Sequence, residues 1–231
     1  MMMRLYDFDI NGSLEFEEGA SICLTIENKR YFKEAVDYFK GIEKDIKRFS
    51  VTFGDNELVY QKDFATVIDY YDYETVSRTI SAKTLKFIAE RISKDDETLL
   101  SFRNKISELH TVVSHALYDC DIEFEDDPVC SFDDVLKLFS VTPSGSREAP
   151  IYKYLNMIEL AAALRMYKLI VFVNIKSFFE KDELIELQKL AAYKNIALLL
   201  IENTINNYAT DRETNYLIDD DLFLTKTNSL L

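Results

Sequence analysis

Two apolar runs with an amphipathic stretch between them dominate the hydrophobic pattern of this chain. Residues 169–175 read LIVFVNI and residues 196–201 read IALLLI, and neither run shows the polar alternation of a half-exposed strand. Such runs are typical of strands buried on both faces, as in a parallel sheet. Between the runs, apolar residues recur at helical spacing at Leu184, Leu187, Leu190 and Ala191. The pattern predicts a β-α-β unit, because its length suits the crossover that parallel strands require.

A second strand-then-helix unit is predicted near the N-terminus. Residues 21–26 form a buried run, and residues 29–41 carry an apolar helical face that ends at Gly41. The carboxyl ends of parallel strands are where α/β folds usually hold ligands. Shorter strands are expected at residues 14–16, 51–53, 58–60 and 222–225.

The period is helical from about residue 64 to residue 118, apart from a charged break at residues 93–97. No Pro or Gly interrupts residues 55–127, which favours two or more long helices packed together. The sequence therefore predicts an α/β domain made of residues 1–60 and 148–231, with an α-helical domain of residues 61–147 inserted in it.

Charge and cysteine content narrow the class of protein. The 231 residues include 41 acids and 27 bases, and this net charge of −14 argues against broad nonspecific binding to nucleic acid. Eight acids lie within residues 119–134, which leaves 33 acids against 27 bases elsewhere and allows a local basic surface. The three cysteines are scattered along the chain, as is usual in a reducing cytosol. The sequence shows neither the pattern of a signal peptide nor an apolar stretch of membrane-spanning length. We therefore expect a cytoplasmic protein without a membrane segment.

Glycine positions exclude the common nucleotide-binding loops. A P-loop and a GxGxxG loop both need glycine, because their backbone N–H groups wrap closely around phosphate. No two glycines here are five residues apart, and no Gly-Lys dipeptide exists. The sequence also lacks the GxSxG elbow of an α/β-hydrolase. We therefore expect an α/β fold without its usual nucleotide site. The glycines are Gly12, Gly19, Gly41, Gly54 and Gly145.

Alternating acids in the middle of the chain are the first candidate site. Asp119, Asp121, Glu123 and Glu125 would project to one face of an extended backbone, about 7 Å apart at successive steps. Carboxylates so placed repel one another unless a cation neutralises them. Hard oxygen ligands with flexible spacing favour calcium, or magnesium with retained waters. A solvated acidic loop and a nuclease-type metal pair are the alternatives.

Polar residues at the predicted strand ends form the second candidate site. Glu27-Asn28 follows the first buried strand, Asn174 ends the second, and Glu202-Asn203 follows the third. If these strands are parallel neighbours, all of these residues share one edge of the sheet. The alternative is that they simply end the strands and that the nearby bases are solvated. The bases that could meet DNA phosphates at this edge are Lys29, Arg30, Lys33, Lys176 and Lys181.

Five stretches, in matching order, resemble one known family. They are LTIENKRYFKEAVDYF (24–39), DCDIEFED (119–126), KLIVFVNIKSFFEKDELIELQKL (168–190), IALLLIEN (196–203) and LIDDDLFL (217–224). The chain resembles the CRISPR-associated spacer-acquisition protein of type II-A systems, the family that forms rings around double-stranded DNA. The resemblance covers most of the chain and rests on pattern rather than on a catalytic signature. It is poor at residues 40–60 and 140–150.

The resemblance implies both a fold and a function. The fold would be a head resembling a P-loop NTPase core without its nucleotide loop, with an inserted α-helical leg and an acidic hinge. Calcium would be bound by Asp119, Asp121, Glu123 and Glu125, where Glu125 replaces the Asp of the family pattern. The protein would form a homotetrameric ring that binds linear duplex DNA through a positive interior, without catalytic activity. It would act in spacer acquisition beside the CRISPR integrase proteins and the effector nuclease.

Two other functions also fit the residues. A metal-dependent nuclease would use the acids of residues 119–127, whereas an acidic DNA mimic would block a nucleic-acid-binding enzyme without binding DNA.

A chain with a charge of −14 can bind DNA only where its acids are neutralised or turned away. Calcium would neutralise them, and a ring would collect weak basic sites from several subunits. Binding is therefore expected to fall steeply with salt.

Overall fold

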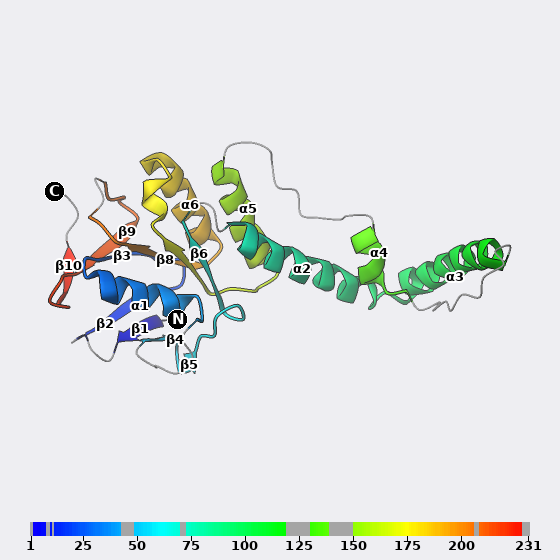
Figure 1. Ribbon diagram of the computed structural model, residues 1–231, viewed down its shortest axis with the longest axis horizontal. Helices are drawn as coiled ribbons and strands as arrows, with labels where there is room; N and C mark the ends of the chain where they lie inside the picture. The colour runs from blue at the N-terminus through cyan, green and yellow to red at the C-terminus, as the bar shows by residue number, and fades with distance from the viewer. Residues whose placement is uncertain are drawn as a thin grey trace. The chain divides into compact units, whose positions relative to one another are not determined.

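The computed structural model describes residues 2–7, 10, 12–42, 49–69, 73–118, 130–138, 150–205 and 208–227 (Figure 1). The chain divides into two compact units. The larger unit comprises residues 1–78 and 145–231, and the smaller unit comprises residues 79–144. The larger unit is thus discontinuous in sequence, with the smaller unit inserted in it.

A six-stranded sheet forms the centre of the larger unit, in the order β10-β9-β3-β8-β7-β6. Strands β9, β3, β8, β7 and β6 run parallel, and β10 pairs with β9 in the antiparallel sense. Strands β7 and β8 are buried along their whole length, which explains why their sequences are continuous apolar runs. The strands are β3 (Ser21–Ile26), β6 (Phe64–Ile68), β7 (Leu169–Val173), β8 (Ala197–Glu202), β9 (Glu213–Ile218) and β10 (Leu224–Thr227).

One face of the central sheet packs against helix α1 (Lys29–Phe39) and a small antiparallel sheet (Figure 1). The small sheet has the order β2-β1-β4-β5. Alternate residues of the central strands enter this core, among them Leu24, Val171 and Leu199. The strands of the small sheet are β1 (Met2–Asp7), β2 (Ser13–Glu17), β4 (Phe49–Phe53) and β5 (Asn56–Glu57).

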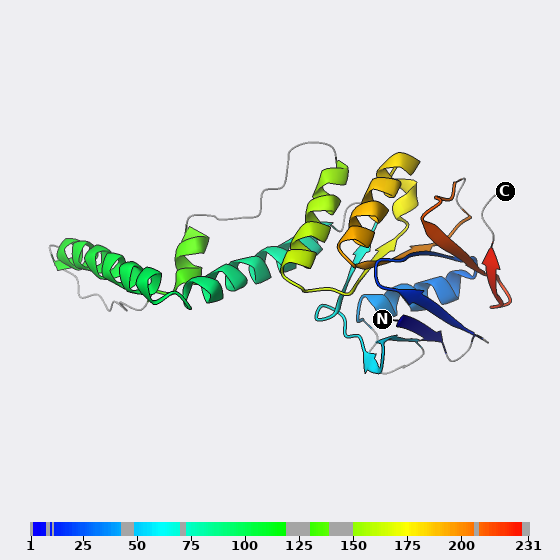
Figure 2. The ribbon, with the colours of Figure 1, turned by 180° about the vertical axis from the view of Figure 1, so that it is seen from behind.

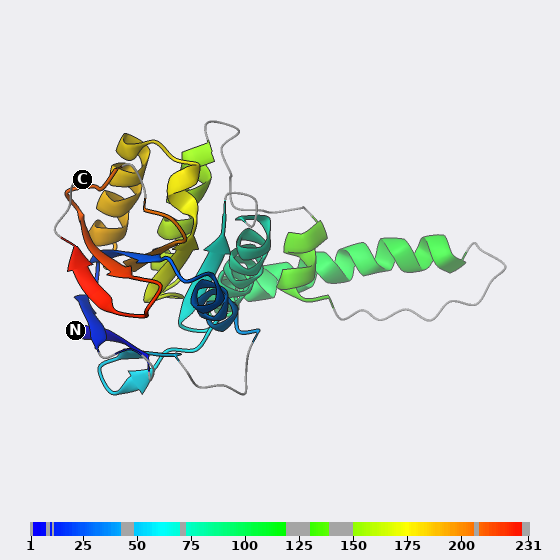
Figure 3. The same cartoon turned by 60° about the vertical axis from the view of Figure 1, so that its left-hand side comes forward.

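Helices α5 (Pro150–Ala163) and α6 (Lys181–Tyr193) lie on the opposite face of the central sheet (Figures 2 and 3). The Tyr154 ring lies 5.9 Å from the Phe172 ring, centroid to centroid, and so joins α5 to β7. Between β7 and α6, the chain forms a short 3-10 helix, η1 (Ile175–Ser177). The order β7-α6-β8 confirms the predicted β-α-β unit.

Helices make up most of the described residues of the smaller unit. It contains residues 79–92 of α2 (Tyr73–Ile92), together with α3 (Asp96–Tyr118) and α4 (Phe132–Leu138). The turn between α2 and α3 falls within the predicted charged break. At the start of α4, the Asp134 backbone N–H donates to the Ser131 hydroxyl, and the Ser131 N–H donates to the Asp134 carboxylate, each over 3.2 Å.

The α/β class and the insertion of a helical segment were predicted correctly, but one boundary was not. Residues 64–68 form strand β6 at the edge of the central sheet, so the helical insertion cannot begin near residue 60. This apolar segment, FATVI, is too short for its periodicity to separate a strand from a helix. The strand predicted at residues 58–60 forms instead at Asn56–Glu57.

Candidate functional site

The carboxyl ends of β3, β7 and β8 meet at one edge of the central sheet, as predicted. At this edge the Asn174 backbone N–H donates to the Ile201 carbonyl over 2.8 Å. The Asn174 side-chain oxygen accepts a hydrogen bond from the Asn203 backbone N–H over 3.2 Å. Asn174 therefore ties the end of β7 to the end of β8, which is a structural role.

The connection from β3 to α1 occupies the place where a P-loop would lie, and it has only two residues, Glu27 and Asn28. Asn28 caps α1, because its side-chain oxygen accepts a hydrogen bond from the Tyr31 N–H over 3.0 Å. Its side-chain amide also donates to the Asp220 carbonyl over 3.1 Å. A two-residue link has no length to wrap a phosphate, since a P-loop motif spans about eight residues.

Four of the five predicted DNA-facing bases are exposed. Lys29, Arg30 and Lys33 lie in the first turns of α1, and Lys181 is the first residue of α6. The Arg30 guanidinium is 3.0 Å from the Glu34 carboxylate, and the Lys33 ammonium is 3.5 Å from the Asp37 carboxylate. These pairs partly neutralise α1, so its surface is less basic than the sequence indicated.

The prediction for Lys176 was wrong, because its side chain is 1% exposed and cannot face a duplex. The Lys176 ammonium forms an ion pair with the Glu213 carboxylate over 2.5 Å. Burial alone would lower the pKa of Lys176, but neighbouring Cys23 and Glu213 outweigh that effect and the pKa is raised. Lys176 lies in η1, in which Ile175 is buried as well.

Several buried polar groups complete the surroundings of this ion pair. Gln188 of α6 donates to the other Glu213 oxygen over 2.9 Å, and the Thr210 backbone N–H donates to Glu213 over 3.1 Å. The Thr210 hydroxyl in turn donates to the Gln188 carbonyl oxygen over 2.7 Å. Burial raises the pKa of the nearby Cys23 thiol to about 12.

Sequence reasoning missed this buried cluster. The one available signal was Gln188, a polar residue on the apolar α6 face formed by Leu184, Leu187 and Ala191. Glu213 and Thr210 lie in a polar stretch that offers no such contrast. Because a fully satisfied cluster can hold elements in place without any ligand, we interpret it as a structural feature of the larger unit.

The predicted calcium ligands Asp119, Asp121, Glu123 and Glu125 lie outside the residues that the structure describes. Within the described ranges, no group of three or more His, Cys, Asp or Glu side chains is arranged to hold a metal ion. The calcium site therefore stays a prediction.

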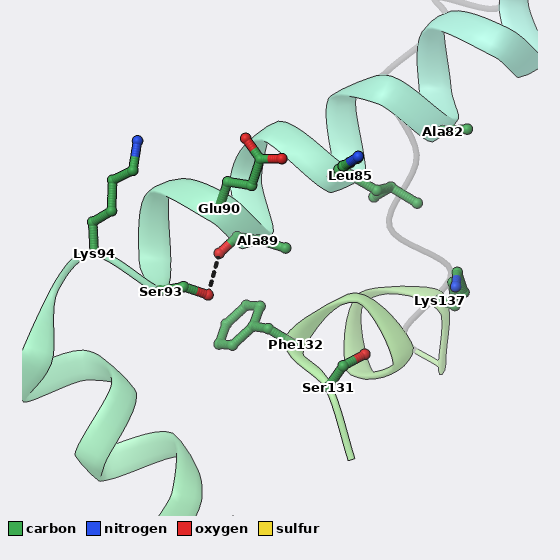
Figure 4. A pocket seen from close by; sticks show the side chains of 10 residues that line it. Ala82, Leu85, Ala89, Glu90, Ser93, Lys94, Ser131, Phe132 and Lys137 are labelled. Atoms are coloured by element: carbon green, nitrogen blue, oxygen red, sulfur yellow. Dashed lines mark hydrogen bonds between the residues drawn. The ribbon is translucent and has the colours of Figure 1, made fainter. Parts of the chain in front are cut away.

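A groove lies between α2 and α4 in the smaller unit (Figure 4). Its volume is about 760 Å³. The apolar part of its lining comes from Ala82, Leu85, Ala89 and Phe132. Lysines and polar residues complete the lining: Lys86, Lys94, Lys137, Glu90, Ser93 and Ser131.

These features define an α/β protein with a P-loop-like parallel sheet, a closed nucleotide position and an inserted helical unit. The family model described as "CRISPR-associated protein (Cas_Csn2)" matches residues 43–222. The chain belongs to this Csn2 family, which confirms the resemblance found in the sequence, and its role is CRISPR-associated.

Solved structures similar to this chain include the following two. The crystal structure of Stu0660 of Streptococcus thermophilus matches with a TM-score of 0.62 and 14% identity, over 99% of this chain and 76% of that one. At this identity the likeness shows the fold alone. The ADP conformation of MJ1267, an ATP-binding cassette of an ABC transporter, matches with a TM-score of 0.44 and 12% identity. That match covers 94% of this chain and 86% of the other. No curated protein sequence matches.

Among the described residues, every helix is too short or too polar to cross a membrane.

Proposed function

We propose that this protein is a non-catalytic ring that binds the ends of double-stranded DNA during CRISPR spacer acquisition and is stabilised by calcium. The observation that carries the proposal is the family match over residues 43–222. In this role it would work beside the CRISPR integrase proteins and the effector nuclease. The following features of the chain support individual parts of the proposal.

The closed nucleotide position supports a role without ATP hydrolysis. The two-residue link from β3 to α1 leaves the α1 N-terminus capped by Asn28 rather than open to a phosphate. A nucleotide bound there would have to displace that cap and would find no glycine backbone to approach.

Helix α3 supports self-association. It has 23 residues, and none of them is buried. Apolar residues nevertheless recur along it with the three- and four-residue steps of a heptad: Leu99, Phe102, Ile106, Leu109, Val113 and Ala116. Leu109 is 55% exposed and Val113 is 46% exposed. The Phe102 ring packs against Phe132 of α4, with 4.7 Å between the ring centroids. Leu109 and Val113 are the exposed part of the stripe, which a helix of a further subunit would cover.

The charges support DNA binding only in an assembled form. Exposed Lys29, Arg30, Lys33 and Lys181 would each contribute a weak contact with phosphate. In a homotetramer these contacts multiply, because several sites engage one duplex at the same time. Asp119, Asp121, Glu123 and Glu125 would bind calcium, which would neutralise acids that otherwise repel DNA.

A gel-shift experiment tests this function. A linear duplex and the same DNA as a closed circle are compared, each in calcium and in EGTA. We expect calcium-dependent binding to the linear form only, as a ring threaded from an end requires. The variant Asp121→Ala with Glu123→Ala should bind less calcium, show a lower native mass and lose binding. Glu186→Ala with Asp220→Ala removes two exposed acids elsewhere and should leave all three unchanged.

Three outcomes would overturn the proposal. Equal binding to linear and circular DNA would exclude threading from an end. Loss of intact DNA in magnesium or manganese would indicate a metal-dependent nuclease. No binding in any condition would favour an acidic DNA mimic, and this result would be followed by a search for the inhibited enzyme.

A further inference from the structure

Helix α2 carries a concentration of positive charge that is unusual in this acidic chain. Residues 79–94 contain four bases and a single acid, Glu90, whereas the whole chain has a net charge of −14. We call these four bases the α2 strip. They are Lys83, Lys86, Arg91 and Lys94.

Most residues of the α2 strip lie on one face of the helix. At about 100° per residue, Lys83, Lys86 and Lys94 fall within about 80° of arc, and Arg91 lies about 60° beyond Lys94. At a rise of about 1.5 Å per residue, the strip runs about 16 Å along the helix and its terminal turn. Lys86, Arg91 and Lys94 are exposed, and Lys83 is half-buried.

The exposed members of the strip are not neutralised as the α1 bases are. Arg30 and Lys33 of α1 pair with acids of their own helix. By contrast, within the described part of the chain no ion pair joins Lys86, Arg91 or Lys94 to a carboxylate. The acids at residues 95–97 begin α3, where the helix N-terminus favours negative charge.

Lys86 and Lys94 also line the groove between α2 and α4, together with Lys137. Figure 4 labels Lys94 and Lys137 at the groove. Three of the ten residues that line the groove are lysines, and a single one, Glu90, is an acid. A row of flexible cations beside such a groove suits a long anion that passes across the surface rather than a compact ligand.

We propose that the α2 strip contacts the phosphate backbone of duplex DNA. This inference rests on the proposed function, and it identifies a DNA surface on the smaller unit in addition to the bases of the larger one. A length of about 16 Å corresponds to about four to five nucleotides of one strand, at about 3.4 Å per nucleotide along the duplex axis. Contacts between basic side chains and phosphate carry no sequence information, so a contact of this kind is independent of sequence.

The test removes the same charge at two places. One triple variant replaces the exposed members of the strip: Lys86→Gln, Arg91→Gln and Lys94→Gln. The matched control replaces three other exposed bases: Arg103→Gln, Lys105→Gln and Lys189→Gln. Both variants have the same net charge. Affinity for a linear duplex is measured by fluorescence anisotropy between about 50 and about 200 mM salt, with native mass and circular dichroism as checks on assembly and folding.

We expect the strip variant to bind at least about tenfold more weakly than the control. Its plot of log affinity against log salt should be shallower by about 0.9 for each phosphate that the strip no longer neutralises. Equal weakening in both variants would show that only net charge matters, and it would overturn this inference. Weaker binding with an unchanged slope and a reduced native mass would indicate impaired assembly instead, and it would also overturn it. If the unmodified protein binds no DNA, the proposed function fails, and the inference fails with it.

Discussion

The two units differ in how completely their side chains are buried. In the larger unit, every residue of β7 and β8 is buried between α1 and the small sheet on one face and α5 and α6 on the other. In the smaller unit, the longest helix, α3, has no buried residue. Burial of apolar area is the main source of folding free energy. The larger unit therefore carries most of the stability of the chain, and the smaller unit mainly presents surfaces.

Lysine shows the same difference at the level of one residue type. Lys176 of the larger unit is buried in an ion pair with Glu213, whereas Lys86 of α2 and Lys94 of the turn that follows it are exposed. A buried ammonium that loses its partner leaves an uncompensated charge, but an exposed one does not. The location of a lysine, rather than its presence, decides whether it affects stability or binding.

The largest expected effect follows from the buried ion pair. Lys176→Met leaves the Glu213 carboxylate buried without its partner, and we expect a loss of about 3–5 kcal/mol in the free energy of unfolding. Adding Glu213→Gln removes that charge and should recover part of the loss. Urea denaturation gives the values, with Lys86→Met as the exposed control, expected within about 0.5 kcal/mol of the unmodified protein. A Lys176→Met protein as stable as this control would refute the structural role.

Two leucine-to-alanine changes compare the cores of the units directly. Leu199→Ala empties a fully buried position in β8 and should lower the free energy of unfolding by about 2–5 kcal/mol. Leu109→Ala, in the exposed stripe of α3, should change it by no more than about 0.5 kcal/mol. We expect Leu109→Ala to lower the native mass instead, because the stripe is proposed to pack against another subunit. Equal destabilisation by both changes would contradict the comparison.

The effect that is smallest at neutral pH is a loss of stability that develops only at alkaline pH. Burial raises the pKa of Cys23 to about 12 from its ordinary 9.0, and that of Tyr38 to about 12 from 10.0. The unfolded chain therefore loses these protons first, so stability is full below about pH 9 and falls between about pH 9 and 12. Each group contributes at most about 1.4 kcal/mol per pH unit. Thermal unfolding measured across this pH range should show that the Cys23→Ala variant loses less stability than the unmodified protein.

The matched control for that measurement is Cys130→Ala, because Cys130 is half-buried and lies in the smaller unit. Its alkaline profile should follow that of the unmodified protein. If Cys23→Ala and Cys130→Ala alter the profile equally, the alkaline loss does not come from the buried interior of the larger unit.

Sequence patterns were sufficient to predict an element where burial of its apolar residues alone decides its structure. The apolar runs at residues 169–175 and 196–201 predicted β7 and β8 because a strand covered on both faces must be apolar throughout. Helix α1 was predicted from its apolar face, and the missing glycines indicated the closed nucleotide position. Strand β9 was missed, because its residues are mostly half-buried and its first three, Glu213, Thr214 and Asn215, are polar.

By itself, the sequence determined the α/β class, the helical insertion, the absence of a nucleotide loop and the family. These depend on composition and local periodicity, which are properties of neighbouring residues. Only the tertiary structure decided that Lys176 points inward to Glu213, 37 residues later, while Lys181 stays exposed. It alone also assigned residues 64–68 to the central sheet. Such choices depend on which distant segments come together, because burial and pairing are properties of the whole packed chain rather than of any one segment.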